Sequence, residues 1–266
     1  MKSKELLAVF FGTFLLILLG DGVVANVALA PRVAGTAYNW NTIALGWGFA
    51  VAVAGVVAGA DNNPALTVAM AMRGATPWSK VIPILIAEFA GAFLGALGVY
   101  LVYRDGLAAA GMPNVWSTGP GSTFSTVFFG SQSTNATGTY SLLTASVAEF
   151  FGTMVLMWGL LGTKDRRNTV LGKAEPFVMG GVVLVIGLCL GGPSGYSINP
   201  ARDLGPRLFG LLAGTKGLFD GLYWLIPPVL IPFIAAPIAG YLYDLFFASE
   251  SKPEEKVAAI KAKAAE

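Results

Sequence analysis

The sequence contains no histidine and a single cysteine, Cys189. A lone cysteine forms neither a disulfide within the chain nor a cluster of thiolate ligands, and without histidine the common zinc sites and catalytic triads cannot be assembled. Most familiar enzyme sites are therefore excluded. We expect a protein that is not an enzyme and that holds neither a metal nor a cofactor.

Charged residues are also scarce. They make up 12% of the 266 residues, whereas 55% are hydrophobic and the mean hydropathy is +0.67. An average soluble domain is ~25% charged, so this composition predicts an integral membrane protein. The formal net charge of +2 is small and the basic residues are dispersed, which argues against a nucleic-acid partner.

Several apolar runs are long enough to cross a bilayer, which takes ~20 helical residues. Six of them lie at about 6–29, 41–60, 80–103, 142–162, 176–194 and 222–247. Two further apolar runs, 63–73 and 200–211, are only ~10 residues long and reach about half of the hydrocarbon core. We therefore predict an all-α membrane protein with six transmembrane helices and two short helices that end inside the membrane.

The basic residues predict an orientation. Most of them, including Lys80, Lys164 and the lysines of the tail 249–266, lie on the side that holds both termini in the six-span arrangement, and few, such as Arg104, lie opposite. By the positive-inside rule both termini are cytoplasmic. We expect a multi-pass protein of the plasma membrane whose first run is retained as a span and whose tail is solvated.

The two halves of the chain are similar in sequence. Residues 8–13 match residues 148–153, and Asn63-Pro64-Ala65 matches Asn199-Pro200-Ala201. Each half holds three spans, an odd number, so the second copy must be inverted relative to the first. We expect one domain, 1–248, made of a first repeat at about 5–103, an external loop at 104–141 and a second repeat at about 142–247.

Each Asn-Pro-Ala triplet stands at the start of a short run. Asparagine is a preferred N-cap, proline suits the first helical position, and alanine is small enough to let two helix tips approach. A helix that starts inside the membrane leaves backbone N–H groups unpaired, which is tolerated only beside a water-filled path. In an inverted repeat the two starts meet near the midplane with their positive ends facing one constriction. This arrangement disfavours cations and predicts a channel for neutral polar solutes.

The paired triplets and the repeat resemble the major intrinsic protein family, the aquaporins and glycerol facilitators, over residues 5–247. The resemblance implies the aquaporin fold and passive conduction that excludes ions and protons. It also implies a homotetramer in which each subunit has its own pore, and no cofactor.

The resemblance further implies an outer selectivity filter made of Trp47, Gly187, Tyr196 and Arg202. In the second span Ile43 is the alternative, because Trp47 matches the family pattern only if four residues are deleted. Water-selective members have histidine at the Gly187 position. Glycine there is expected to widen the filter and leave an apolar wall for a carbon backbone, while Arg202 donates hydrogen bonds to solute hydroxyls.

Two further features are typical of the glycerol-conducting branch of the family. Asp203 directly follows the filter arginine, and residues 123–126, Thr-Phe-Ser-Thr, lie in the predicted external loop. Together with the filter they predict an aquaglyceroporin that conducts glycerol, water and other small neutral solutes.

The remaining carboxyl groups within the apolar runs are expected to be supports. The resemblance implies that Glu149 and Glu88 accept backbone N–H groups of the loops before the short helices. Asp61, which stands where the family usually has histidine, is expected to hold the loop at the cytoplasmic mouth. We expect Asp21, near the outer end of the first span, to contact the vestibule or a loop, and Cys189 to be a packed small residue.

Three other functions fit parts of the pattern. A water- or peroxide-selective aquaporin differs from the leading hypothesis only in the filter. A proton-coupled secondary transporter shares inverted repeats and broken helices, and it would use Glu149 as its proton site. An intramembrane protease would need Asp21 and Asp61 together, but the predicted topology places them near opposite faces.

Overall fold

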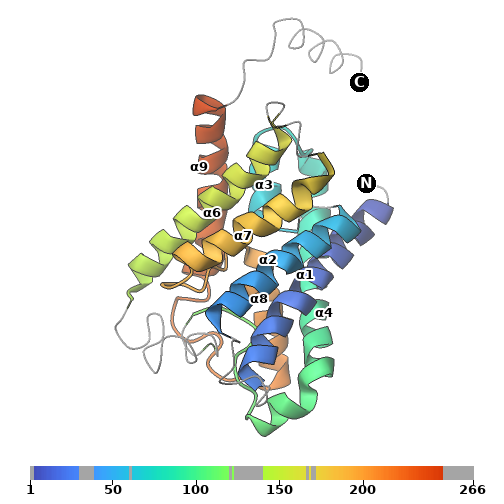
Figure 1. The fold of residues 1–266 in the computed structure, drawn as a ribbon, viewed down its shortest axis with the longest axis vertical. Helices are drawn as coiled ribbons and strands as arrows, with labels where there is room; N and C mark the ends of the chain where they lie inside the picture. Colours follow the sequence, from blue (N-terminus) through green and yellow to red (C-terminus); the bar gives the residue numbers. More distant parts are fainter. Residues whose placement is uncertain are drawn as a thin grey trace, which may run out of the picture.

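The computed structural model describes residues 3–29, 39–59, 62–119, 122, 140–165, 168 and 172–247. Within these ranges it consists of helices and loops, with one isolated β-bridge between Asn114 and Ser122 (Figure 1). The helices are α1 (Ser3–Leu29), α2 (Trp40–Ala58), α3 (Pro64–Met72), α4 (Trp78–Ala109), α6 (Leu142–Lys164), α7 (Glu175–Leu190), α8 (Pro200–Ala213) and α9 (Ile231–Phe246). A 3₁₀ turn, Gly172–Ala174, precedes α7, and a π-helical turn, Ile226–Leu230, precedes α9.

The six predicted spans and the two short helices are all present. In the described chain, α1, α2, α4, α6 and the continuous helix Ile226–Phe246 are long and apolar enough to cross a membrane. The remaining span, α7, is the fifth in chain order; it has 16 residues and is extended at its start by the 3₁₀ turn. The short helices α3 and α8 have 9 and 14 residues, too few to span the ~30 Å hydrocarbon core at 1.5 Å per residue.

Two boundaries differ from the sequence prediction. Helix α4 continues to Ala109, so the first six residues of the predicted external loop are helical. Its last turns carry the exposed residues Arg104 and Asp105, which end the apolar run but not the helix. The last span begins with the π-helical turn at Ile226, where Pro227 and Pro228 lack the N–H groups that a regular α-helical ladder requires.

The packing of the helices follows an inverted repeat. Helix α1 packs against α4 in the first half, as α6 packs against α9 in the second, and α2 packs against α7 between the halves. Each short helix packs against the last span of the other half, α3 against α9 and α8 against α4. In Figure 1 the two short helices lie toward opposite ends of the bundle, and the start of α1 lies at the same end as the end of α9.

A pair of glycines sets the contact between α2 and α7. A Cβ atom on Gly48 would lie 2.8 Å from the carbonyl oxygen of Gly180, and one on Gly180 would lie 2.4 Å from that of Gly48. Small residues at such crossings let helix backbones approach closely inside a membrane. This contact fixes the spacing between the helices that carry Trp47 and Gly187.

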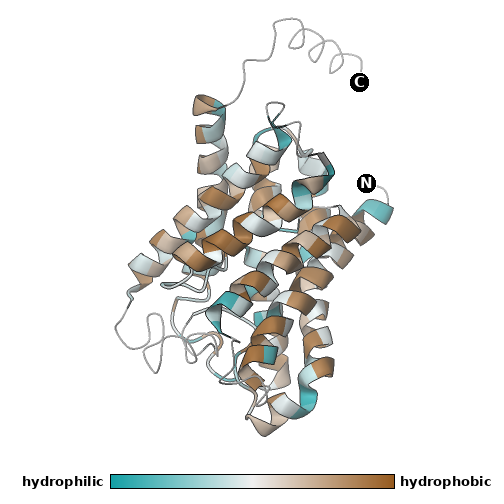
Figure 2. Ribbon diagram, in the orientation of Figure 1, coloured by the Kyte–Doolittle hydropathy of each residue, from teal (hydrophilic) through white to brown (hydrophobic). Residues whose placement is uncertain are grey.

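The outer surface of the bundle is apolar. Figure 2 shows hydrophobic residues along the lengths of the helices and hydrophilic ones mainly at their ends. Large side chains such as Phe49, Ile86, Leu101 and Leu212 are exposed there, as expected for a surface solvated by lipid. Cys189 is also exposed, so the prediction that it is a packed residue was wrong. It lies on the outward face of α7. The pattern of hydrophobic residues did not identify that face, because this helix is apolar on all sides.

Candidate functional site

Both Asn-Pro-Ala triplets begin a helix in the predicted way. Asn63 has an extended backbone and its Oδ1 accepts a hydrogen bond from the Ala65 N–H at 3.0 Å. Asn199 does the same for the N–H groups of Ala201, at 3.0 Å, and Arg202, at 3.1 Å. Pro64 and Pro200 occupy the first helical positions, where a missing N–H costs nothing. The predicted N-caps are therefore confirmed.

The two triplets meet, as the repeat predicted. The Asn63 Nδ2 atom donates to the carbonyl oxygen of Ile198 at 2.8 Å, and the Asn199 Nδ2 atom donates to that of Asn62 at 2.7 Å. Each amide NH₂ has two hydrogens, so one hydrogen on each asparagine can serve a solute. The two helix starts, with their positive ends, are thus joined at one constriction.

The segment before α8 is strained and is held by Glu149. Tyr196 and Ile198 have positive φ angles of 41° and 46°, a region that residues with a side chain seldom adopt. Glu149 on α6 is fully buried, and its two carboxylate oxygens accept the N–H groups of Ser197, at 2.7 Å, and Ile198, at 2.6 Å. The bracing role that the family resemblance implied for Glu149 is the one it has in this fold.

In the first half, the carboxylate next to the short helix is Glu88, in the third span. It is fully buried in α4 and accepts a hydrogen bond from the hydroxyl of Thr67, in α3, at 2.8 Å. The bond ties the first short helix to the third span. Asp61, the other predicted support of this loop, lies outside the described residues.

A cavity of about 260 Å³ passes through the constriction. Its lining extends from Lys164 and Glu175, at the ends of α6 and α7, past Asn63 and Asn199 to a cluster at its other end. That cluster contains three of the four residues predicted to form the filter, Trp47, Tyr196 and Arg202. Ile43, the alternative to Trp47, is buried one turn away in α2 and is not among the lining residues.

Arg202 lies against Trp47. The Cζ atom of the guanidinium is 3.9 Å from the centroid of the indole ring, within the range of a cation–π contact. The Nη1 atom of Arg202 is 3.4 Å from Oδ1 of Asp21, a carboxylate of α1. Asp21 was expected to contact the vestibule or a loop, and the contact observed is with Arg202 of the predicted filter. The sequence analysis missed this pairing.

Gly187 and Tyr196 also lie in contact. A Cβ atom on Gly187 would be 2.8 Å from Cζ of the Tyr196 ring. The ring thus occupies the space that a side chain at position 187 would fill. Glycine was expected to widen the filter and leave an apolar wall, and the Tyr196 ring beside Gly187 is the apolar surface found there.

Trp40 is a site residue that sequence reasoning did not identify. Its Nε1 atom donates to the carbonyl oxygen of Gly187 at 3.0 Å, and its ring meets that of Tyr196 edge to face, with centroids 5.7 Å apart. Its spacing was an available signal. Trp40 and Trp47 are seven residues apart, two helical turns on the same face of α2.

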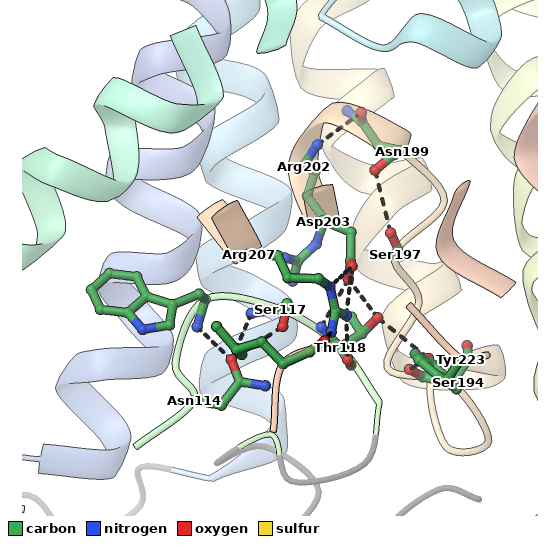
Figure 3. A network of polar contacts seen from close by, with 12 residues as sticks. Asn114, Ser117, Thr118, Ser194, Ser197, Asn199, Arg202, Asp203, Arg207 and Tyr223 are labelled. Carbon is green, nitrogen blue, oxygen red and sulfur yellow. Dashed lines mark hydrogen bonds and ion pairs between the residues drawn. The ribbon is translucent and has the colours of Figure 1, made fainter. Parts of the chain in front are cut away.

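Asp203 supports the end of the site that holds the filter residues, without lining the cavity (Figure 3). Its Oδ1 atom pairs with Arg207, at 2.9 Å to Nε and 2.6 Å to Nη2, and its Oδ2 atom accepts from the backbone and hydroxyl of Thr118, at 2.8 and 2.7 Å. Arg207 in turn donates to the carbonyl oxygens of Thr118 and Leu218. The pair ties α8 to the segment that follows α4.

Comparison with known proteins gives consistent similarities. A family model described as major intrinsic protein matches residues 1–243. The chain is 40% identical over 254 residues to a probable glycerol uptake facilitator protein of Thermotoga maritima, covering 91% of this chain and 98% of that protein. It is 41% identical over 259 residues to glycerol uptake facilitator protein 3 of Lactiplantibacillus plantarum, covering 91% of this chain and 97% of that protein.

More distant relatives and a solved structure agree with these. The chain is 35% identical over 255 residues to human aquaporin-10, covering 92% of this chain and 81% of that protein. The X-ray structure of the aquaglyceroporin from Plasmodium falciparum superposes with a TM-score of 0.77 at 28% sequence identity, covering 91% of this chain and 96% of that one.

Proposed function

The chain belongs to the major intrinsic protein family, and from that premise we propose that it is a passive channel for glycerol, water and similar small neutral solutes. The observation that carries the proposal is the arrangement of one cavity. Two asparagine amides at joined helix starts and a stacked Trp47–Arg202 pair line the same passage. Relatives that cover nearly the same length are named glycerol uptake facilitators.

The lining suits a polyol. The rings of Trp47 and Tyr196 offer apolar surface to a carbon backbone, and the Arg202 guanidinium offers N–H donors to hydroxyl oxygens. At the constriction Asn63 and Asn199 offer two further donors. A neutral hydroxylated solute can therefore exchange water for protein hydrogen bonds along the passage.

Ions are disfavoured by the same features. The starts of α3 and α8 each carry about half a positive charge and face the constriction. A cation would meet these positive ends after losing its hydration shell, and the lining offers little negative charge in return. This supports conduction that excludes cations and protons.

The other classes of function are not supported. Both oxygens of Glu149 accept backbone N–H bonds that hold a strained segment, so the carboxylate has a structural use that a proton-coupling site would not need. The family comprises channels and facilitators, and we propose that the chain is not an enzyme. Asp61 lies outside the described residues, and Asp21 lies beside Arg202, which leaves the protease alternative without support.

We also propose how the channel is arranged in the cell. The chain would form one channel domain, 1–248, in the plasma membrane, assembled as a homotetramer with a cytoplasmic tail at 249–266. Cytoplasmic termini are supported by Lys4, Lys80 and Lys164, which line one recess at the end of the bundle where α1 starts. The resemblance to the family supports the tetramer.

A single reconstitution tests the function. Proteoliposomes and protein-free vesicles are challenged by stopped flow with water, glycerol, dihydroxyacetone, urea and peroxide, with and without a proton gradient. We expect glycerol entry well above that of protein-free vesicles, unsaturated at low millimolar glycerol and unchanged by the gradient. Water flux without glycerol flux would instead indicate a water-selective channel, and flux that requires the gradient would indicate a transporter.

A further inference from the structure

We propose that Gly20 and Asp21, two adjacent residues of α1, position the selectivity filter. Gly20 seats the ring of Trp47 and Asp21 holds the guanidinium of Arg202, although neither residue lines the cavity. The inference deepens the proposed function, on which it rests, because it states what sets the width of the filter and the direction of its donors.

Asp21 is a buried carboxylate that faces Arg202. It is fully buried, and its Oδ1 atom lies 3.4 Å from Nη1 of Arg202, which is itself only 7% exposed. The second oxygen, Oδ2, makes no hydrogen bond within the described part of the chain. Burying a carboxylate in a membrane protein is costly unless it is paired, so its position beside the guanidinium points to a function in holding that group.

Gly20 provides the seat for Trp47. A Cβ atom on Gly20 would lie 2.2 Å from Cζ3 and 2.4 Å from Cε3 of the indole, closer than atoms approach without displacement. The ring therefore lies directly against the backbone of α1, and Trp47 is 3% exposed. Any larger residue at position 20 would push the ring away from α1.

The two contacts act on one stacked pair. The guanidinium of Arg202 contacts both partners, with Cζ 3.9 Å from the centroid of the indole ring and Nη1 3.4 Å from Oδ1 of Asp21. The backbone of Arg202 is held separately, since its N–H donates to the cap residue Asn199 at 3.1 Å. The backbone of Arg202, the face of the guanidinium against Trp47 and the Nη1 atom are therefore all engaged. Only the remaining N–H groups of the guanidinium can donate to a solute in the cavity.

The contact with Asp21 also bears on selectivity. Its Oδ1 atom lies 3.4 Å from Nη1 and so holds the guanidinium of Arg202 in one direction. Recognition then depends on the direction of the N–H donors and on the width between the rings. Both are set from α1.

The test is a set of variants reconstituted as the full-length channel. Asp21→Ala removes the acceptor, whereas Asp21→Asn keeps an oxygen that can still accept from Nη1. Gly20→Ala displaces the indole, and Gly22→Ala is its matched control because a Cβ there meets nothing within 4 Å. Asp105→Ala, on the exposed outer end of α4, controls for loss of a negative charge. Each Asp21 variant is also made together with Arg202→Ala.

The readout is the ratio of glycerol to water permeability. We expect Asp21→Ala to lower it about five- to tenfold, the loss of about one hydrogen bond, and Asp21→Asn to restore most of it. Gly20→Ala should lower glycerol permeability more than water permeability, because the displaced ring narrows the passage for the larger solute. In the Arg202→Ala background Asp21→Ala should have no further effect on the ratio.

Other outcomes would overturn the inference. They are an Asp21→Ala effect that persists without the arginine, Asp21→Asn no better than Asp21→Ala, or Gly20→Ala equal to Gly22→Ala. Should Asp21→Ala fail to fold, the isosteric Asp21→Asn is compared with and without Arg202→Ala. Failure of the proposed function is distinguishable, since it would show in the wild-type channel as glycerol permeability no higher than that of protein-free vesicles.

Discussion

Asn63 and Asn199 each donate a hydrogen bond to the backbone carbonyl that directly precedes the other, at 2.8 Å to Ile198 and 2.7 Å to Asn62. Each also caps its own short helix through Oδ1. One pair of amides therefore closes two helix starts and joins them. Because donor and acceptor lie on the same side chain, the two roles can be separated by a single isosteric change.

Asn63→Asp keeps the cap acceptor but replaces the NH₂ donor by an oxygen that faces the carbonyl of Ile198. We expect the channel to be destabilised by ~1–3 kcal/mol, the usual cost of leaving a buried polar group without its partner. The added negative charge at the positive helix ends should also raise cation leak. Thermal unfolding in detergent and potassium flux from proteoliposomes measure the two effects.

The matched control is Asn39→Asp, which changes the N-cap of α2 at the edge of the bundle, where no bond between the two triplets is involved. That variant should keep wild-type stability and potassium flux. Equal behaviour of the two variants would contradict the importance of the joined triplets.

In Glu149→Gln a single oxygen remains to accept from the backbone N–H groups of Ser197 and Ile198. The new NH₂ group faces the second N–H, so that N–H has no acceptor. The strained segment at Tyr196 and Ile198 then loses part of its support, so we expect a loss of ~1–3 kcal/mol of stability together with reduced glycerol permeability. Glu5→Gln, an exposed carboxylate that pairs with Lys80, should change neither. A Glu149→Gln channel that keeps stability but loses a dependence on proton gradients would instead support the transporter alternative.

Gly187→Ala places a methyl group 2.8 Å from the Tyr196 ring and must displace it. We expect glycerol permeability to fall about tenfold, with water permeability much less affected, since ~1.4 kcal/mol of added barrier is tenfold in rate. Stopped-flow measurement of both solutes checks this. Gly181→Ala on the same helix, where a Cβ meets nothing within 4 Å, should match the wild type. Equal loss of water and glycerol in Gly187→Ala would speak against a change in filter width.

Asp203→Asn breaks a buried ion pair and leaves Arg207, which is 2% exposed, without its charged partner. Removing one member of a buried pair costs ~3–5 kcal/mol, so we expect a large drop in the midpoint of thermal unfolding. Asp105→Asn removes the acid of an exposed pair with Arg104 and should leave the midpoint unchanged. If Asp203→Asn has the same midpoint of thermal unfolding as the wild type, the network that holds the segment around Thr118 does not stabilise the protein.

Much of the fold was predictable because its signals are local. The length of an apolar run decides whether a helix can span the membrane, and Asn-Pro at its start decides where a short helix begins, as the observed starts at Pro64 and Pro200 illustrate. The odd number of spans per repeat then requires inversion. The end of α4 was predicted less well, because Arg104 and Asp105 end the hydrophobic run while the helix continues to Ala109.

The site was predictable where it follows a motif and not where it depends on packing. Arg202 and Tyr196 flank the second triplet, and both line the cavity with Trp47. Trp40 was missed because no motif contains it, although its spacing from Trp47 places both on one helix face. Cys189 was assigned wrongly because an all-apolar helix gives no periodic signal for its buried side.

The sequence by itself determined the membrane class, the inverted repeat, the two capped half-helices and the family, since these depend on composition, run length and short motifs. Only the tertiary structure decided that Asp21 lies beside Arg202, 181 positions away, and that the Tyr196 ring fills the space at Gly187. Those contacts depend on how far each helix is rotated and how closely glycine lets backbones approach. These are properties of the packed bundle, which a residue pattern along a single helix does not contain.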